Sequence, residues 1–336
     1  MNKKVFVSVI MPVLNEERYI DECLKSLLAQ DYPQEKMEWI FVDGNSRDRT
    51  VDILNEYKNK YPDMITIYSN KNITAPYAMN IGIENAKGEY IIRLDAHAKY
   101  EPYYISKCVE CLDTVDADNV GGMAITEGKG FTGKCIAKML SSRFGVGNSQ
   151  FRTNGTSGYV DTVPFGAYKR EVFEKWGNYD TRLSRNEDNE LNYRIRKNGG
   201  KVYLSNDIRF TYYCRDSISG ICKMAFNNGK WNIVAMLLCP GSMGIRHFIP
   251  MLFVLSIIFL AILGMRISMF NWLLYIELLL YFLLDLFFSA KLADSFKEML
   301  MLLFLFPVFH IAYGIGSISS IGLIVSTLKK PDNSFD

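Results

Sequence analysis

The sequence predicts an α/β protein, in which a soluble domain built on a mostly parallel sheet is followed by membrane helices. Strand and helix signals alternate over residues 1–115, which is typical of a parallel sheet with helices on both faces. The charged fraction of 22% is ordinary, yet the mean hydropathy reaches +0.01. Charged and apolar residues must therefore be segregated along the 336-residue chain.

Four short apolar runs, rich in β-branched and aromatic residues, are the strand candidates of the first domain. The first run resembles a signal peptide, because Lys3 and Lys4 precede it. However, Glu16 and Glu17 follow closely and no small-residue cleavage site is present, so a buried strand is the better interpretation. The expected strands are residues 5–11, 37–43, 64–69 and 90–95.

Three helical stretches separate these strands. In the first, Asn15 is the expected N-cap, and Glu16 and Glu17 suit the positive end of the helix dipole. Its apolar stripe runs from Ile20 to Leu28. The other expected boundary residues are Ser46 or Asp48 as the cap of the second helix, and Thr74, Pro76 and Gly88 at the ends of the third.

The C-terminal part is predicted to enter a lipid bilayer, which takes about 20 apolar residues to span. Residues 299–328 carry no charge, and Glu277 and Asp285 are the only acidic residues between 247 and 290. These two acids are either functional or structural. Pro307, Gly314 and Gly316 leave open whether the last segment is one tilted helix or a broken one. The expected boundaries are a soluble domain at 1–235 and a membrane domain at 236–330, with spans at 248–265, 270–288 and 299–328.

Charge and cysteine content exclude other classes of protein. The chain has 38 Lys and Arg against 36 Asp and Glu, a net charge of +2, so no field is available to hold nucleic acid. The seven scattered cysteines do not resemble a disulfide framework. Together with the positive charges that flank the spans, this favours a soluble domain that faces the cytoplasm from the cell membrane.

Acidic residues follow the predicted strands at the positions where α/β sheets bind ligands. Asp43 and Asp95 lie at the carboxyl ends of two strands, and such ends meet at one edge of the sheet. Asp43 can accept a hydrogen bond from a ligand or close an Asx turn. His97 follows Asp95 by two residues and is either a metal ligand or a structural histidine. Asp188 lies in an acidic cluster at a helix start, which is also consistent with dipole stabilisation.

Five segments, taken together and in this order, resemble the motifs of family 2 inverting glycosyltransferases, which share the nucleotide-sugar-binding GT-A fold. The resemblance covers residues 5–235. A closer likeness is to bacterial glucosyltransferases of succinoglycan and related exopolysaccharide assembly, carried by 95–98 (DAHA), 160–170 (VDTVPFGAYKR) and 185–194 (RNEDNELNYR). The five segments are 9–17 (VIMPVLNEE), 42–48 (VDGNSRD), 80–83 (NIGI), 88–95 (GEYIIRLD) and 187–188 (ED).

The resemblance implies a nucleotide-binding site at Pro12, Val13, Glu16, Asp43 and Asp95. In that role Asp43 would accept the imide N–H of uracil, which favours a UDP-sugar donor. Guanine offers a similar N–H, so a GDP-sugar stays open.

A divalent cation on the donor's diphosphate is also implied. The family usually has Asp-x-Asp where this chain has Asp95-Ala96-His97. Carboxylate and water suit Mg²⁺, whereas a nitrogen ligand is better tolerated by Mn²⁺. We therefore expect Asp95 and His97 to be the metal ligands, with Mn²⁺ favoured over Mg²⁺.

The resemblance makes Asp188 the general base that deprotonates the acceptor hydroxyl, with Glu187 as a supporting acid. The reaction would be a single displacement with inversion at the anomeric carbon. Gly166 would allow close approach in the sugar and acceptor pocket. Lys230 and Trp231 would join that pocket, but the Gln-x-x-Arg-Trp motif of many processive members is absent, which argues against a polymer synthase.

The expected function is the transfer of one sugar from a nucleotide-diphosphate donor to a polyprenyl-diphosphate-linked saccharide, in exopolysaccharide, capsule or other surface-glycan assembly. One alternative is a polyprenyl-phosphate glycosyltransferase, which acts directly on the lipid phosphate. Another is a membrane protein that binds a nucleotide without turnover. The analysis of products separates the first two, and nucleotide binding without release of product marks the third.

Overall fold

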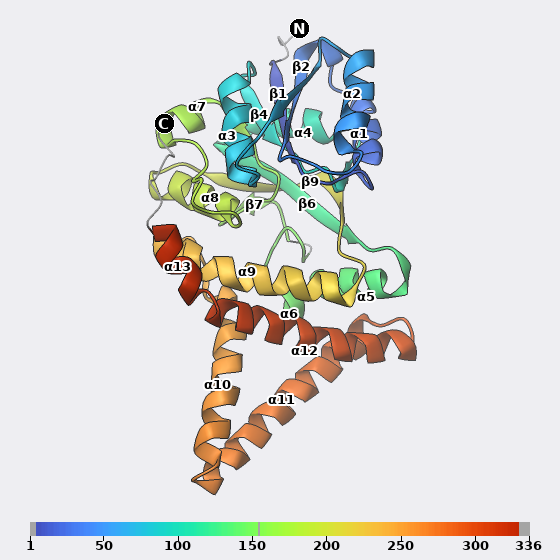
Figure 1. Ribbon diagram of the computed structural model, residues 1–336. Helices are drawn as coiled ribbons and strands as arrows, with labels where there is room; N and C mark the ends of the chain where they lie inside the picture. Colours follow the sequence, from blue (N-terminus) through green and yellow to red (C-terminus); the bar gives the residue numbers. More distant parts are fainter. Residues whose placement is uncertain (1–4, 154, 329–336) are drawn as a thin grey trace. The chain divides into compact units, whose positions relative to one another are not determined.

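The computed structural model describes residues 5–153 and 155–328, which form two compact units (Figure 1). The first unit contains residues 5–125 and 155–213. The second contains residues 126–153 and 214–328. The segment 126–153 is thus a part of the second unit inserted within the sequence of the first.

A mixed sheet forms the centre of the first unit. Its strand order is β3-β2-β1-β4-β8-β6-β9-β5, and β7 pairs with β9. The first four strands in the chain are parallel, as the alternation of signals predicts, whereas β8 runs antiparallel to both β4 and β6. The strands are β1 (Val7–Val13), β2 (Met37–Asp43), β3 (Ile65–Ser69), β4 (Tyr90–Arg93), β5 (Ala98–Tyr100), β6 (Asn119–Glu127), β7 (Gly158–Tyr159), β8 (Ala167–Lys169) and β9 (Val202–Tyr213).

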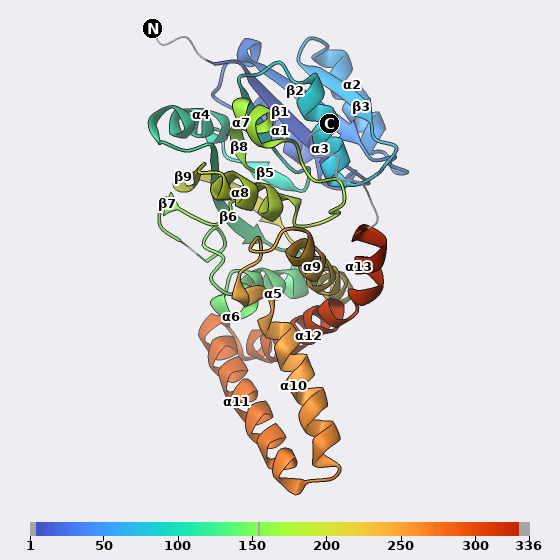
Figure 2. The ribbon, with the colours of Figure 1, turned by 90° about the vertical axis from the view of Figure 1, so that its left-hand side faces the viewer.

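The strand order places the helices and fixes the edge where a ligand can bind. Because crossovers between parallel strands are right-handed, the helices after β1 and β2 lie on one face and the helix before β4 lies on the other (Figures 1 and 2). The direction of succession reverses between β1 and β4, and ligands bind beyond the strand ends at such a point. The helices of this unit are α1 (Ile20–Leu28), α2 (Thr50–Lys60), α3 (Ala75–Asn85), α4 (Tyr104–Thr114), α7 (Glu171–Trp176) and α8 (Glu187–Lys197), with a 3-10 turn at Gln34–Lys36.

Burial explains why the central strands are apolar throughout. Every residue of β2 is buried, and β1 is buried except at Pro12, because helices cover both faces of these strands. Large aromatic side chains fill the core between the sheet and the helices. Those with almost no exposed surface include Trp39, Phe41, Tyr100, Tyr104, Tyr168, Tyr179 and Phe210.

The expected cap of the first helix is wrong. Asn15 has a positive φ of 55°, and α1 begins only at Ile20, with Asp21 as an acidic residue of its first turn. Asn15 Oδ1 instead accepts a hydrogen bond from the Arg47 amide at 2.8 Å, and the Asn15 amide donates to Ser46 Oγ at 2.9 Å. These hydrogen bonds connect the loop after β1 to the loop after β2. Both loops lie at the carboxyl ends of the parallel strands, the edge of the sheet where a ligand can bind, which we call the ligand edge.

The second helix also begins later than expected. α2 starts at Thr50 without a side-chain cap, and Asp48 Oδ1 accepts from the Thr50 amide at 3.0 Å in a turn that precedes the helix. The third helix begins as predicted, with Pro76 in its first turn, but Ala86 rather than Gly88 ends it.

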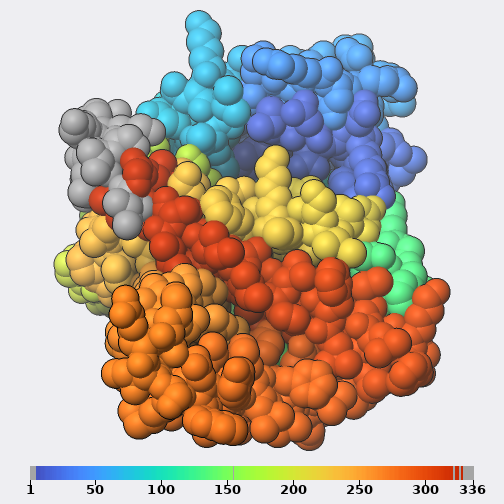
Figure 3. Space-filling model, turned by 60° about the horizontal axis from the view of Figure 1, so that its bottom comes forward, coloured from blue at the N-terminus to red at the C-terminus, as the bar shows by residue number. Residues whose placement is uncertain are grey.

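Apolar helices make up most of the second unit. α11 and α12 are long and apolar enough to cross a membrane, by length and composition alone, whereas α10 is a shorter apolar helix of 16 residues. A tight turn joins α10 to α11 (Figure 2), and both helices, together with α12, expose apolar side chains. The surfaces of these three helices are orange to red in Figure 3. The elements are α5 (Gly130–Leu140), α6 (Arg143–Val146), α9 (Ile218–Leu238), a 3-10 turn (Ile245–His247), α10 (Ile249–Gly264), α11 (Ser268–Leu292), α12 (Phe296–Ile318) and α13 (Ile321–Leu328).

The last expected span is broken, but not at the residues the sequence suggested. Pro307 lies inside α12, and the chain turns only after Ile318. Gly314 and Gly316 are packing positions, since a Cβ at Gly314 would lie 2.4 Å from the Pro250 carbonyl oxygen and one at Gly316 would lie 2.0 Å from that of Phe226. The glycines therefore let α10 and α9 approach α12 closely.

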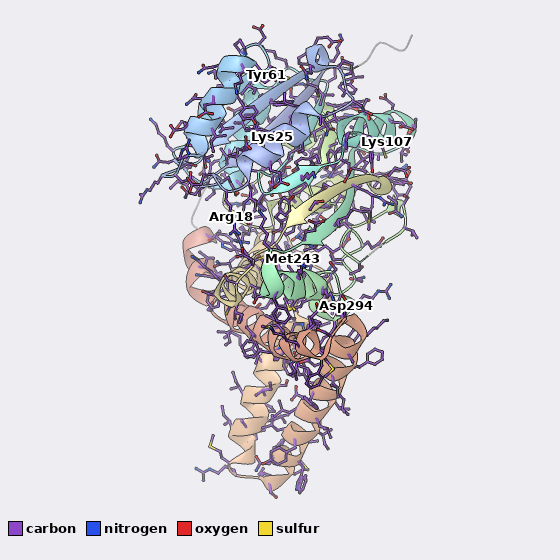
Figure 4. All side chains as sticks on the ribbon, turned by 90° about the vertical axis from the view of Figure 1, so that its right-hand side faces the viewer. Arg18, Lys25, Tyr61, Lys107, Met243 and Asp294 are labelled. Carbon is purple, nitrogen blue, oxygen red and sulfur yellow. The ribbon has the colours of Figure 1, made fainter. Side chains whose placement is uncertain are left out.

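Polar side chains within the apolar helices pair with one another. Glu277 accepts a hydrogen bond from Ser256, which joins α11 to α10, and Asp285 accepts from Ser289 at 2.9 Å. These contacts support the structural interpretation of both acids. At the other end of α11, Asp294, labelled in Figure 4, forms a 2.7 Å ion pair with Lys138 of α5.

The cysteines behave as predicted. All seven are free thiols, and five of them are buried.

Candidate active site

The carboxyl ends of β1, β2 and β4 lie beside one another at the ligand edge of the first unit. Val13 is the register partner of Asp43, and Arg93 at the end of β4 pairs with Ile10 of β1. The chain then continues past β4 to Asp95. This register brings together three of the expected nucleotide-binding positions at the ends of neighbouring strands: Pro12, Val13 and Asp43.

Asp43 closes a turn with its own side chain. Its Oδ2 accepts from the amides of Asn45 at 3.0 Å and Ser46 at 3.1 Å, and its Oδ1 accepts from Ser46 at 3.2 Å. Asn45 has a positive φ of 68°, and a Cβ at Gly44 would lie 2.8 Å from the Ile73 carbonyl oxygen. The turn therefore requires a small residue at 44. Because a carboxylate has about four acceptor positions, Asp43 retains capacity for one further donor.

Glu16 and His97 form a pair that the sequence did not indicate. His97 Nδ1 lies 3.2 Å from Glu16 Oε1, and each side chain is about one-fifth exposed, 23% and 20% respectively. Glu16 thus contacts the loop between β4 and β5, and it precedes α1, which begins only at Ile20.

Asp95 is held in place through its backbone. Its amide donates to Tyr100 Oη at 2.8 Å, and Tyr100 Oη donates back to the Asp95 carbonyl at 3.0 Å. Tyr100 is buried, so it fixes the loop while the Asp95 carboxylate remains partly exposed.

Arg93 joins the two acidic segments of the site. Its Nη1 donates to Asp188 Oδ1, and its Nη2 donates to Glu187 Oε1 at 3.0 Å. Its Nε lies 3.7 Å from Asp95 Oδ1, which is an ion pair without a hydrogen bond. One guanidinium group therefore faces three carboxylates, and the cluster of these four side chains carries an excess of negative charge.

Burial shifts the ionisation of the expected base. The pKa of Asp188 is raised to about 7, chiefly by loss of solvent and also by repulsion from Glu187 and Asp95, although Arg93 lowers it. A carboxylate of this kind can accept a proton near neutral pH. The geometry therefore suits a general base.

Local backbone geometry presents these acids at the first turn of α8. Asn186, immediately before the helix, has a left-handed φ of 65°, a conformation that asparagine adopts more readily than most residues. The chain therefore turns sharply into α8. Glu187 and Asp188 follow as its first two residues, and both reach Arg93.

Three further pocket residues are expected from the sequence: Gly166, Lys230 and Trp231. Gly166 accepts a hydrogen bond from the Arg93 amide at 3.0 Å through its carbonyl oxygen. A Cβ at Gly166 would lie 2.4 Å from Asn119 Oδ1, so the close approach at this glycine is to the protein's own core. Lys230 and Trp231 are half-buried on α9 in the second unit.

Two residues of the cluster are absent from the expectations drawn from the sequence: Arg93 and Tyr179. The signal for Arg93 was present, because a charged residue inside an apolar strand is rarely buried without partners. Tyr179 gave no such signal, since its contact with Arg93 depends on the tertiary fold.

Comparison with known proteins identifies the family. A model of the glycosyl transferase family 2 matches residues 8–177. A dolichyl N-acetyl-alpha-D-glucosaminyl phosphate 3-beta-D-2,3-diacetamido-2,3-dideoxy-beta-D-glucuronosyltransferase of Methanococcus voltae is 30% identical over 269 residues, which cover 78% of this chain and 83% of the relative. The succinoglycan biosynthesis protein ExoA of Rhizobium meliloti is 27% identical over 266 residues, which cover 79% and 78% of the two chains.

Solved structures agree on the fold. The mannosyltransferase PcManGT of Pyrobaculum calidifontis, solved with GDP-Man and Mn²⁺, superposes with a TM-score of 0.58 at 19% identity, covering 98% of this chain and 88% of that one. S. aureus TarS 1-349, solved with UDP, gives a TM-score of 0.50 at 17% identity, covering 94% and 90%. The expected GT-A architecture is confirmed, and the chain belongs to glycosyltransferase family 2.

Proposed function

We propose that this enzyme moves one sugar from a UDP-linked donor to a polyprenyl-diphosphate-linked saccharide, with inversion at the anomeric carbon, in the assembly of a surface glycan. The observation that carries the proposal is the cluster in which Arg93 joins Asp188 and Glu187 to Asp95. It supports the proposal because Asp188, the candidate proton acceptor, and Asp95, at the ligand edge, both lie against the same arginine.

Asp188 would act as the general base. Its raised pKa keeps the carboxylate basic enough to take the proton of an acceptor hydroxyl as that oxygen attacks the anomeric carbon. The bond from that carbon to the donor's diphosphate breaks in the same displacement. Glu187 supports the base, since its negative charge raises the proton affinity of Asp188.

Pro12, Val13 and Asp43 would receive the nucleotide. The acceptor capacity that remains on Asp43 suits one N–H of the base, and Gly44 keeps the backbone small beside it. UDP in the TarS structure and GDP-Man in the PcManGT structure make both nucleotides reasonable donors to test. We favour UDP because uracil is the smaller base for the same hydrogen bond.

A divalent cation at this site would need ligand atoms from the donor as well as from the protein. The described part of the chain contains no group of three His, Cys, Asp or Glu side chains that could enclose a metal ion. Asp95 and His97 would hold the cation, together with oxygens of the donor's diphosphate. When bound, it would offset the negative charge of the departing diphosphate, and the nitrogen ligand favours Mn²⁺ over Mg²⁺.

The acceptor's lipid accounts for the apolar helices. We propose that α10, α11 and α12 place the second unit in the cell membrane, with the catalytic domain on the cytoplasmic side. The broad exposure of apolar side chains on α10 and α11 supports this assignment. Lys230 and Trp231 on α9 would then meet the acceptor, the first through phosphate charge and the second by stacking.

The choice of acceptor rests on a relative's name. The protein of Methanococcus voltae is named for transfer to a lipid phosphate that already carries a sugar. This favours a lipid-linked saccharide over a bare polyprenyl phosphate as the acceptor of this enzyme.

The test is the release of nucleotide and the capture of product by the detergent-solubilised, full-length protein. UDP- and GDP-sugars would be supplied with Mn²⁺ and a lipid extract, and the product lipid analysed by mass spectrometry. Donor-specific transfer that Asp188→Asn abolishes supports the proposal. The control is Asp63→Asn, an exposed acid between α2 and β3 and therefore at the opposite edge of the sheet. Equal activity of Asp188→Asn and the control would remove Asp188 from the reaction.

A further inference from the structure

We propose that Arg93 is the positioning residue of this active site: its buried guanidinium group holds Asp188 and Glu187 in place relative to Asp95. The inference rests on the proposed function and adds a residue to it. Arg93 does not face the substrate, because only 7% of its side chain is exposed. Its effect on the reaction therefore passes through the three acids.

The two ends of the guanidinium group differ in how firmly they bind. Nη1 and Nη2 each donate a hydrogen bond, to Asp188 and Glu187, so the consecutive acids of α8 are fixed by one planar fork. Nε is buried and has no hydrogen-bond partner among the described residues, and it lies 3.7 Å from Asp95. Asp95 is attracted without being bonded, so its oxygens stay available for a ligand.

Arg93 is itself held by two further contacts. Its amide donates to the Gly166 carbonyl at 3.0 Å, and its Cζ lies 5.8 Å from the centre of the Tyr179 ring, within cation–π range. Tyr179 is fixed by Asn80 of α3, which accepts from the Tyr179 amide at 2.9 Å and donates to its carbonyl at 2.9 Å. The fork therefore has a fixed origin, as a positioning group requires.

Charge and geometry together require arginine at this position. A buried cation must be paired, and a guanidinium group remains charged at every pH of interest. Lysine would supply the same charge as a single point, which cannot donate along two directions fixed in one plane. Arg93→Lys therefore preserves the charge and removes the fork, which separates positioning from simple neutralisation.

The first experiment measures transfer kinetics and nucleotide binding of the full-length protein and its Arg93→Lys variant. We expect kcat to fall about 100-fold, because a displacement of about 1 Å in a reacting group can cost that much, while KM for the donor and the Kd for UDP change less than about threefold. The matched control is Arg194→Lys, since Arg194 holds Glu190 with a similar fork on the same helix but touches none of the three acids. Near-wild-type kcat in Arg93→Lys, or an equal loss of kcat in both variants, would overturn the proposal.

The second experiment needs no turnover and therefore separates this proposal from the proposed function. Arg93→Met should lower the midpoint of thermal unfolding, because it leaves the acids without their cation. The same change should lower the midpoint much less in a background of Glu187→Gln and Asp188→Asn. Equal losses in both backgrounds would contradict the pairing, even in a protein that transfers no sugar. Absence of transfer by the wild type, with the pairing intact, would contradict the proposed function alone.

Discussion

Arg93 Nη2 donates a 3.0 Å hydrogen bond to Glu187 Oε1, which joins the end of β4 to the first residue of α8 across 94 positions of the chain. The bond connects the segment that ends in Asp95 with the segment that contains Asp188. Both segments resemble family motifs when read separately. Their relation to each other exists only in the folded sheet, where β8 and α8 return to the edge formed by β1 and β4.

The pH dependence of transfer should follow Asp188. Burial raises the pKa of this acid to about 7, and a general base works only when it is deprotonated. We therefore expect kcat to be highest above pH 7 and to fall about tenfold per unit as the pH drops below it. A profile of kcat between pH 5 and 9, at saturating donor, checks this. A flat profile down to pH 5 would contradict either the raised pKa of Asp188 or its role as the base.

Ionisation of Asp188 should also lower the free energy of unfolding at alkaline pH. Its pKa in the folded protein lies above its value of about 4 in an unfolded chain, so folding favours the protonated form. The stability that this provides is complete below the unfolded value and is lost as the pH rises through about 7. Asp188→Asn should therefore unfold at a higher temperature than the wild type at pH 8. The difference should shrink as the pH falls from 8 toward 4, and an equal difference at both pH values would contradict the linkage.

Much of the fold could be predicted from local patterns. The four parallel strands lie where the apolar runs predicted them, with the range 37–43 matching β2 at both ends. The predicted caps of the first two helices are wrong because the loops after β1 and β2 are hydrogen-bonded to each other. Asn15 and Ser46 bond to residues of the opposite loop, a relation that no local pattern contains. The roles of Gly314 and Gly316 were also ambiguous, since glycine is common both where a helix breaks and where two helices pack closely.

The site was predictable where a residue acts alone. Asp43 and Asp95 followed from their places at strand ends, as expected for a parallel sheet. The pairing of His97 with Glu16 was not, because Glu16 had a sufficient local explanation in the helix dipole. Arg93 was visible as a charge in an apolar strand, but its partners were not, since the nearest of the two acids on α8 is 94 residues away.

Gly166→Ala should destabilise the first unit. A Cβ at this position would lie 2.4 Å from Asn119 Oδ1 and 2.6 Å from Tyr168 Oη, both in a buried region that cannot give way easily. A loss of about 1–3 kcal/mol in the free energy of unfolding is expected from such overpacking. Gly158→Ala is the matched control, because a Cβ there meets nothing within 4 Å. Denaturant unfolding of both variants decides the matter, and equal stabilities would show that the core rearranges.

Removal of divalent cations should abolish transfer, and the cation that restores it best should depend on His97. With an imidazole at this position we expect Mn²⁺ to restore more activity than Mg²⁺, since nitrogen ligands are better tolerated by Mn²⁺. His97→Asp supplies an oxygen ligand and should shift the preference toward Mg²⁺.

The measurement is the ratio of kcat with saturating Mn²⁺ to kcat with saturating Mg²⁺, after treatment with EDTA. Glu16→Gln is the useful comparison, because it keeps the imidazole and removes only the carboxylate 3.2 Å from Nδ1. An unchanged ratio in His97→Asp would place His97 outside the metal's coordination shell, and activity that survives EDTA would exclude a role for a chelatable cation.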